Sequence, residues 1–197
     1  MTTICRISAA ALAVLALAAC DAGAPKFKST DITGADYGRT LELTDFDGKP
    51  RRLQDFRGKA VVLFFGYTHC PDVCPTTLAD LAQVMRQLGK DAERVQVLFV
   101  TVDPERDTRE VLARYVTAFD ARFLGLRGSL EATQRAAKEF KIYFEKHAGG
   151  APGAYSMDHS AQSYVIDPQR RLRLFVRQDR IAQDLAADLR TLLQSAG

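Results

Sequence analysis

Two cysteines, Cys70 and Cys74, lie four positions apart in a segment bracketed by prolines. The apolar run 60–65 comes just before them, and a helical pattern comes just after. A turn between a strand and a helix is accessible, and the start of a helix favours a negative charge. The spacing therefore predicts a pair of thiolates that can bind a soft metal ion, exchange electrons with a disulfide, or do both.

The first twenty residues have the pattern of an export signal. Arg6 provides a small positive region, and the apolar run 9–19 is too short to cross a bilayer. The run ends in Leu-Ala-Ala-Cys at Cys20, which resembles the bacterial lipoprotein box and implies cleavage before Cys20 and attachment of lipid to it. Asp21 resembles the signal that retains such proteins on the inner membrane. We expect a bacterial inner-membrane lipoprotein facing the periplasm; an ordinary cleaved signal peptide is the alternative, and both export the domain.

The number of cysteines becomes informative once the signal is set aside. Cys5 leaves with residues 1–19 and Cys20 carries lipid, so the folded domain keeps only Cys70 and Cys74. A mature chain of 197 − 19 = 178 residues can bury its own core without a disulfide. A disulfide across so short a loop would restrict the unfolded chain little, which favours redox or metal chemistry for the pair.

The net charge of the chain is small and gives no reason to expect nucleic acid as a partner. Removing the signal takes away one arginine and no acid, so the net charge moves from 27 − 24 = +3 to 26 − 24 = +2. The basic residues are scattered through helical patterns, where a solvated face is the expected role. The composition therefore provides no argument for binding nucleic acid.

The elements that must position the cysteines form one domain over residues 38–197, preceded by a flexible tether over residues 20–37. A hairpin is predicted around residues 41–53, a flexible loop over 149–153, and an extended segment over 143–146. Strands and helices otherwise alternate: strands over 60–65, 95–102, 122–126, 163–166 and 172–176, helices over 75–88, 108–119, 129–140 and 182–195. This order predicts an α/β thioredoxin-like sandwich, with a central mixed sheet flanked by helices and an N-terminal β-hairpin.

Three segments resemble the signature of the Sco/SenC family of copper-binding cytochrome oxidase assembly proteins. They are 66–76 with the paired cysteines, the Val-Asp-Pro-Glu-Arg-Asp of 102–107, and 155–160 with His159. The resemblance extends from about residue 38 to residue 193. It implies that Cys70, Cys74 and His159 bind one copper ion, Cu(I) or Cu(II). It also implies a role at the copper A site of cytochrome c oxidase subunit II, either delivering copper or reducing the cysteines of that partner.

The residue types suit this implied site. Two thiolates suit Cu(I), and one neutral imidazole also tolerates Cu(II). Three ligands leave the metal open to a partner's attacking atom, unlike a closed structural zinc site, and we expect His159 on a mobile loop. Asp158 either orients His159 or caps a turn. Asp103 either lies near the metal loop or forms a turn with Pro104.

Other nearby side chains are weaker candidates for ligands. His69 adjoins Cys70, but neighbours in a tight turn commonly point apart, so tuning or partner contact is the better interpretation. His147 is expected to be a surface histidine. Met157 carries a soft thioether, yet a methionine is more often packed than coordinated.

A thiol-disulfide oxidoreductase is the competing class of function. Peroxiredoxins resemble one another in a threonine three residues before the reactive cysteine, a position that Tyr67 holds before Cys70. Thioredoxins carry a shorter cysteine spacing and a proline before the facing strand, where this chain has His159, Ser160 and Ala161. Reduction of subunit II cysteines, or general periplasmic thiol exchange, stays the alternative. A periplasmic copper donor or thiol reductase would then be a further partner.

Overall fold

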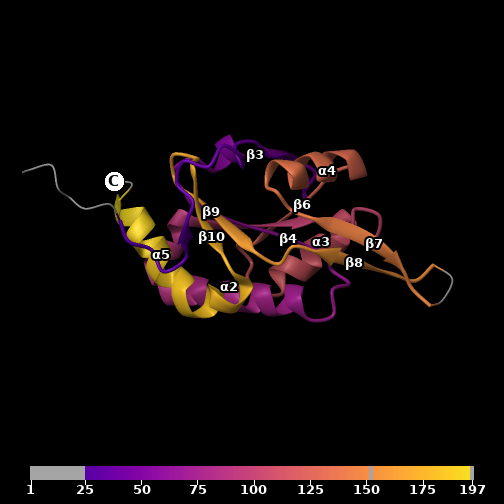
Figure 1. Cartoon of the computed structure of the whole chain (residues 1–197). Coiled ribbons are helices and arrows are strands. Elements are labelled where there is room, and N and C mark those ends of the chain that lie inside the picture. The colour runs from indigo at the N-terminus through magenta and orange to yellow at the C-terminus, as the bar shows by residue number, and fades with distance from the viewer. Residues whose placement is uncertain (1–24, 151–152, 196–197) are drawn as a thin grey trace, which may run out of the picture.

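The structure is a computed structural model that describes residues 25–150 and 153–195. The predicted signal peptide and Cys20 lie outside the described residues. An eight-stranded mixed sheet in the order β1-β10-β9-β4-β5-β6-β2-β3 forms the centre of the domain (Figure 1). Its strands are β1 Thr30–Asp31, β2 Glu42–Asp45, β3 Pro50–Arg52, β4 Ala60–Gly66, β5 Val95–Thr101, β6 Leu124–Arg127, β9 Ser163–Ile166 and β10 Leu172–Val176.

Helices cover both faces of this sheet. Figure 1 shows α4 on one side, and α2 and α5 packed together on the other. The helices are α2 Val73–Leu88, α3 Arg109–Thr117, α4 Leu130–Glu139 and α5 Ile181–Ser195. The predicted thioredoxin-like sandwich is thereby confirmed, and β2 and β3 form the predicted N-terminal hairpin.

The centre of the sheet follows directly from the apolar pattern. All residues of β4 are buried, and β4 pairs in parallel with β5 from Ala60 opposite Val95 to Gly66 opposite Thr101. Parallel strands covered on both faces need such continuous apolar runs. The helix α2, predicted over 75–88, buries an apolar stripe of Leu78, Leu81, Met85 and Leu88 against them. The carboxyl ends of β4 and β5 and the start of α2 therefore meet at one end of the domain.

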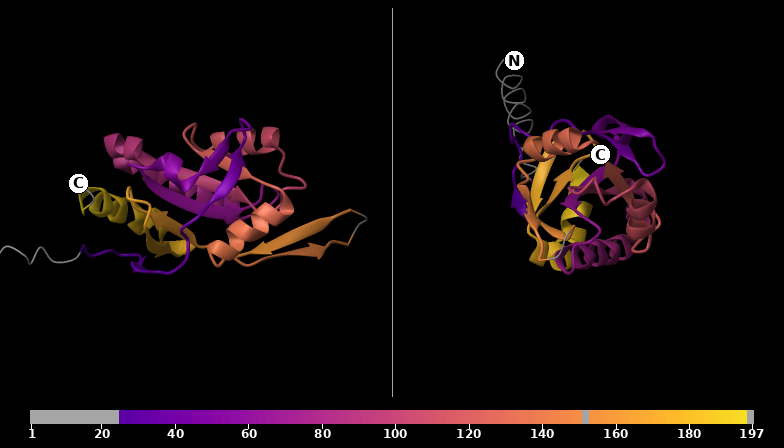
Figure 2. Two further views of the ribbon diagram at one scale, coloured as in Figure 1. Left: turned by 90° about the horizontal axis from the view of Figure 1, so that it is seen from above. Right: turned by 90° about the vertical axis from the view of Figure 1, so that its right-hand side faces the viewer.

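A second, two-stranded sheet projects from that end. β7 Phe144–Ala148 and β8 Tyr155–His159 pair antiparallel and extend from the body of the domain (Figures 1 and 2). We expected His159 on a mobile loop, and this expectation is wrong because His159 is the last residue of β8, opposite Phe144. Backbone pairing between residues on the two sides of the Gly/Pro-rich loop holds this position.

The structured domain begins earlier than residue 38. β1 pairs antiparallel with β10, and the Asp188 carboxylate accepts hydrogen bonds from the backbone N–H groups of Lys28 (2.7 Å) and Ser29 (2.9 Å). Phe27 and Ile32 pack against the core. The tether predicted over residues 20–37 is therefore shorter, because residues 27–37 are held by partners far away in the sequence.

Within residues 25–150 and 153–195, no helix has both the length and the apolar character needed to cross a bilayer.

Candidate metal centre

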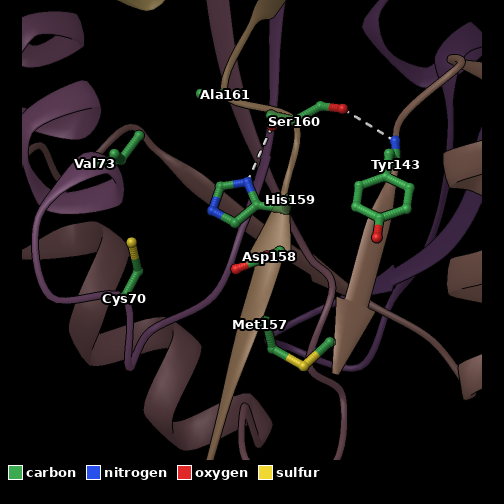
Figure 3. Close-up of a pocket in the computed structure, with 8 residues that line it drawn as sticks. All are labelled: Cys70, Val73, Tyr143, Met157, Asp158, His159, Ser160 and Ala161. Carbon is green, nitrogen blue, oxygen red and sulfur yellow. Dashed lines mark hydrogen bonds between the residues drawn. The ribbon is translucent and has the colours of Figure 1, made fainter. Parts of the chain in front are cut away.

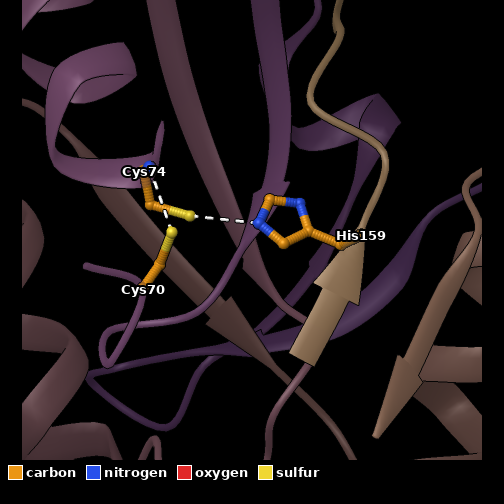
Figure 4. Close-up of side chains that lie close together, drawn as sticks. All are labelled: Cys70, Cys74 and His159. Carbon is orange, nitrogen blue, oxygen red and sulfur yellow. Dashed lines mark hydrogen bonds between the residues drawn. The ribbon is translucent and has the colours of Figure 1, made fainter. Parts of the chain in front are cut away.

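The structure brings the three predicted ligands together. One ligand atom each from Cys70, Cys74 and His159 lies within 4.8 Å of the other two (Figure 4). The Nε2 atom of His159 is 3.3 Å from the Cys74 Sγ, and the Cys74 backbone N–H donates a hydrogen bond to the Cys70 Sγ at 3.4 Å. Both cysteines are free thiols. Two sulfurs and one nitrogen thus converge on one point, which is a donor set suited to copper.

The end of β4 leaves room for the Cys74 sulfur. Cys74 lies in the first turn of α2 and is fully buried, and its sulfur sits over Gly66, the last residue of β4. A Cβ atom on Gly66 would lie 2.7 Å from that sulfur and 2.9 Å from the Phe99 ring. A glycine is therefore required here by the close approach of the sulfur.

Gly66→Ala is expected to displace the Cys74 sulfur and weaken Cu(I) binding at least about tenfold, with a loss of about 1–3 kcal/mol in unfolding free energy from overpacking. A competition titration with a Cu(I) chelator measures the first effect, and chemical denaturation the second. Gly125→Ala is the control, because its Cβ would press on Leu112 at 3.2 Å, in a part of the core away from the sulfurs. Unchanged Cu(I) affinity in Gly66→Ala would contradict this account of the site.

The His159 ring is held by packing and by one hydrogen bond. It contacts the Phe64 and Tyr67 rings edge to face, with centroid distances of 6.2 and 5.8 Å. Its Nδ1 atom lies 3.0 Å from the Ser160 carbonyl oxygen (Figure 3). A carbonyl can only accept, so Nδ1 carries the proton and Nε2 presents its lone pair toward Cys74. This is the tautomer that a metal ligand needs.

Asp158 does not orient His159. Its carboxylate lies 3.1 Å from the Nε2 atom of His147, and both side chains are exposed on the β7–β8 hairpin. Alternation along β8 turns successive side chains to opposite faces, so Asp158 points away from its neighbour. The orienting group is the Ser160 carbonyl, which sequence reasoning missed because any residue supplies one. His147 lies on the surface, as expected.

Asp103 does not contact the three ligands directly; it binds side chains that pack beside them, and it helps to form the turn 103–107. Its carboxylate accepts hydrogen bonds from the Arg106 Nε at 2.5 Å and from the Tyr155 hydroxyl at 2.8 Å, while its carbonyl accepts from the Asp107 N–H. The Arg106 guanidinium packs over the Tyr155 ring at 3.6 Å and the Tyr67 ring at 5.7 Å. Asp103 therefore holds Arg106 and Tyr155 in place, and Arg106 in turn packs over Tyr67, the ring beside His159; Asp103 is not itself placed as a ligand.

Asp107 is a residue of the site whose role the sequence did not reveal. Its buried carboxylate accepts hydrogen bonds from the Thr68 backbone N–H (3.1 Å), the Thr68 hydroxyl (2.6 Å) and the Thr101 hydroxyl (2.5 Å). Burial raises the pKa of Asp107, while the hydrogen bonds from Thr101 and Thr68 act to lower it. The carboxylate fastens the loop that precedes Cys70 to the end of β5. In the sequence, the feature that could have pointed to Asp107 was its position at the end of the Val-Asp-Pro-Glu-Arg-Asp segment.

The two thiols differ sharply in acidity. The hydrogen bond from the Cys74 thiol, helped by the backbone N–H groups of Cys74 and Asp72, lowers the pKa of Cys70 to about 4, although burial opposes this. The pKa of Cys74 is raised by its interaction with Cys70 and by burial. Cys70 is therefore a thiolate at neutral pH, and Cys74 is the protonated partner until a metal displaces its proton.

The alkylation of the metal-free, reduced protein is expected to follow this difference. Cys70 should react with iodoacetamide already at pH 6, because its thiolate forms above a pKa of about 4, whereas buried Cys74 should stay unmodified. Peptide mass spectrometry after timed quenching measures both rates. A Cys70 rate that rises only above a pH of about 8, the ordinary range of a free thiol, would contradict the assignment.

The site opens to solvent through a hollow of about 410 Å³ (Figure 3). The hollow is lined by Cys70, Val73, Tyr143, Met157, Asp158, His159, Ser160 and Ala161.

Met157 is buried among core residues, which agrees with a packing role. The His69 side chain is 55% exposed, and its ring contacts the Thr68 hydroxyl rather than the sulfurs. A partner can therefore reach Cys70 and His159, while Cys74 lies beneath them.

Comparison with known proteins gives consistent matches. The family model described as SCO1/SenC matches residues 29–194. The mitochondrial SCO2 homologues of mouse and human are each 39% identical over 152 residues, which is 76% of this chain but only 60% and 57% of those proteins. This chain thus spans less than two thirds of the length of these relatives.

Solved structures agree with these matches. The copper-bound ScoI of Bradyrhizobium japonicum has a TM-score of 0.73 and 38% identity, covering 79% of this chain and 99% of its own. The apo Sco1 protein of Thermus thermophilus has a TM-score of 0.74 and 41% identity, covering 88% and 98%.

Proposed function

Since this chain belongs to the SCO1/SenC family, we propose that it binds one copper ion through Cys70, Cys74 and His159 and takes part in the assembly of cytochrome c oxidase. The copper-bound ScoI structure supports the metal, because this chain places a Cys-Cys-His donor set in the same fold. The observation that carries the proposal is the convergence of the three ligand atoms within 4.8 Å.

The copper A site of subunit II is the proposed recipient. A metal carrier must release its ion, and a site of three ligands leaves coordination open to an incoming sulfur or nitrogen. The hollow beside Cys70 and His159 gives such an atom a path of approach. Bound copper would be passed by ligand exchange, with the partner's donor atoms replacing His159 and the two thiolates in turn.

The test is a strain carrying His159→Ala, grown at limiting copper. It should lose copper A assembly, while the purified variant keeps most of its ability to reduce a disulfide in an oxidised subunit II fragment, since exchange requires only the thiols. Cys70→Ser should lose both activities. Normal oxidase assembly in the His159→Ala strain would overturn metal delivery through this site.

Thiol-disulfide exchange is the second candidate, and the acidity of Cys70 favours it. A thiolate with a pKa lowered to about 4 is present at neutral pH, and the Cys74 thiol beside it can resolve a mixed disulfide. Attack of the Cys70 thiolate on a partner disulfide would release one partner thiolate. Attack by Cys74 would then release the other and leave a Cys70–Cys74 disulfide, so two electrons pass to the partner.

We further propose that the chain is an inner-membrane lipoprotein that faces the periplasm. The support is the Leu-Ala-Ala-Cys sequence at Cys20 followed by Asp21, which lies outside the described residues. Labelling with a radioactive fatty acid tests this. The wild type should be labelled and Cys20→Ser should not; labelling of the variant would refute the anchor.

A further inference from the structure

The end of the sheet opposite the metal centre gathers exposed basic side chains. Lys59 and Arg94 immediately precede β4 and β5, whose first residues are paired in the sheet. The Gly58 N–H donates to the Pro168 carbonyl at 3.0 Å, which brings the turn that carries Arg170 beside them. We call this set the basic end; its members are Arg57, Lys59, Lys90, Arg94, Arg170 and Arg190.

These cations have few partners of opposite charge. All members of the basic end are exposed, and among the described residues none of them forms an ion pair. The carboxylates nearby that form no ion pair are Asp47, Asp55, Asp91 and Glu93. Others at this end are already paired, Asp120 with Arg122 and Asp167 with Arg171 and Arg173. A net positive surface results, although the mature chain as a whole carries only 26 − 24 = +2.

A hollow of about 480 Å³ lies beside part of the basic end. Arg57 and Lys59 line it together with Arg51 and Arg122, and the carboxylates of Asp47 and Asp55 line it too, so cations outnumber acids there. Long basic side chains can keep their charged heads in water while their stems cover apolar surface.

The end of the domain that carries the metal centre has a surface charge of the opposite sign. Around the metal centre, the exposed carboxylates are those of Asp72, Glu105, Glu145 and Asp158; of these, Glu105 is paired with Lys146 and Asp158 with His147. A negatively charged surface would repel the metal-centre end and attract the basic end. The charge asymmetry therefore favours the orientation in which the basic end faces that surface.

The chain enters the domain at the basic end. Figures 1 and 2 show the start of the described chain beside the C-terminal part of α5, on the side away from the β7–β8 hairpin. The Arg173 guanidinium lies 5.6 Å from the Phe27 ring centroid, so the Phe27 side chain packs near a residue in the first part of β10. Asp188 fastens Lys28 and Ser29 to α5. The tether therefore ends at this end of the domain.

The remaining tether is short. Cys20 and Pro25 are separated by five peptide steps, which span at most roughly 17 Å when extended. At that full extension, about two Debye lengths at physiological salt, attraction to the bilayer would be mostly screened. A tether this short nevertheless allows the basic end to approach the headgroups closely, where the attraction is not screened.

We propose that the basic end rests on anionic lipid headgroups and thereby points the metal centre away from the bilayer, toward its partner. The proposal rests on the proposed lipid anchor at Cys20. Lipid is the occupant that the structure favours, because the tether holds this surface at the membrane and its cations match phosphate groups there.

The test uses the processed chain from residue 20 with Cys20→Ser, so that no lipid contributes. It is sedimented with vesicles of phosphatidylcholine alone, or with about 30% phosphatidylglycerol, at increasing salt. We expect binding to the anionic vesicles only, and its loss at about 0.5 M salt. The triple variant Arg57→Glu, Lys59→Glu, Arg170→Glu should partition at least about tenfold less.

A matched variant separates the basic end from net charge. Arg114→Glu, Arg135→Glu, Lys138→Glu changes the charge equally but lies on α3 and α4, and it should keep most of the binding. Unchanged Cu(I) stoichiometry shows that each variant is folded. Equal losses in the two triple variants, or no binding of the parent chain to anionic vesicles, would overturn the proposal. Because the tested chain carries no lipid, failure of this experiment would not bear on the lipid anchor at Cys20, which the fatty-acid labelling tests separately.

Discussion

Replacing Cys74 with serine is expected to abolish tight copper binding. Cys74 is fully buried; its backbone N–H contacts the Cys70 sulfur at 3.4 Å, and its own sulfur lies 3.3 Å from the His159 Nε2. A hydroxyl is a hard, weakly acidic donor, so the variant loses one of two soft ligands and keeps the cavity shaped for it. We expect one copper per wild-type chain and at least about a thousandfold lower Cu(I) affinity in the variant, since a ligand bond to a soft ion is worth several kcal/mol.

The measurement is copper content after dialysis against a Cu(I) chelator, followed by a competition titration. Cys20→Ser is the matched control, because it makes the same substitution outside the site and should leave copper binding unchanged. Equal copper retention by Cys74→Ser and the wild type would rule out this metal centre. Oxidation of the wild type to a Cys70–Cys74 disulfide should also release the copper, because bonded sulfurs are no longer thiolates.

His159→Ala is expected to separate the two oxidation states of copper. Two thiolates can still hold Cu(I), whereas Cu(II) loses its imidazole, the one ligand of the set that suits it well. We expect about a hundredfold loss for Cu(II) and about tenfold or less for Cu(I). Competition titrations measure both affinities, and the intensity of the sulfur-to-Cu(II) charge-transfer band reports the altered coordination.

The control for this variant is His147→Ala. His147 is exposed on β7 and paired with Asp158, so its removal should change neither affinity. If His159→Ala weakens Cu(I) and Cu(II) equally, the histidine serves the fold of the site rather than the metal. Substituting Tyr67 and Phe64, which pack against the ring, would then become the next step.

Elements with strong local patterns could be predicted to within a residue or two. The continuous apolar runs predicted β4 and β5, and the stripe from Leu78 to Leu88 predicted most of α2. These patterns are readable because burial on both faces of a strand, or on one face of a helix, imposes a period on neighbouring residues. The cysteine pair could be placed for the same reason, since it joins two such elements.

Elements that depend on distant partners escaped prediction. β1 has two residues and exists because β10 pairs with it, and β8 exists because β7 lies opposite across the Gly/Pro-rich loop. β1 is too short to show any period, and β8 shows only the brief alternation Tyr-Ser-Met-Asp-His. The strand that carries His159 and the early start of the domain were therefore visible only in the structure.

By itself, the sequence determined which atoms could bind metal, two thiols and one imidazole, and which strand and helix would carry the thiols. Only the tertiary structure decided that His159, 85 positions from Cys74, brings its Nε2 to within 3.3 Å of that sulfur. It also decided that the Ser160 carbonyl, rather than Asp158, selects the tautomer, and that buried Asp107 fastens the cysteine loop. The physical reason is that ligand chemistry belongs to single residues, whereas distances and hydrogen-bond partners arise from packing between segments far apart in the chain.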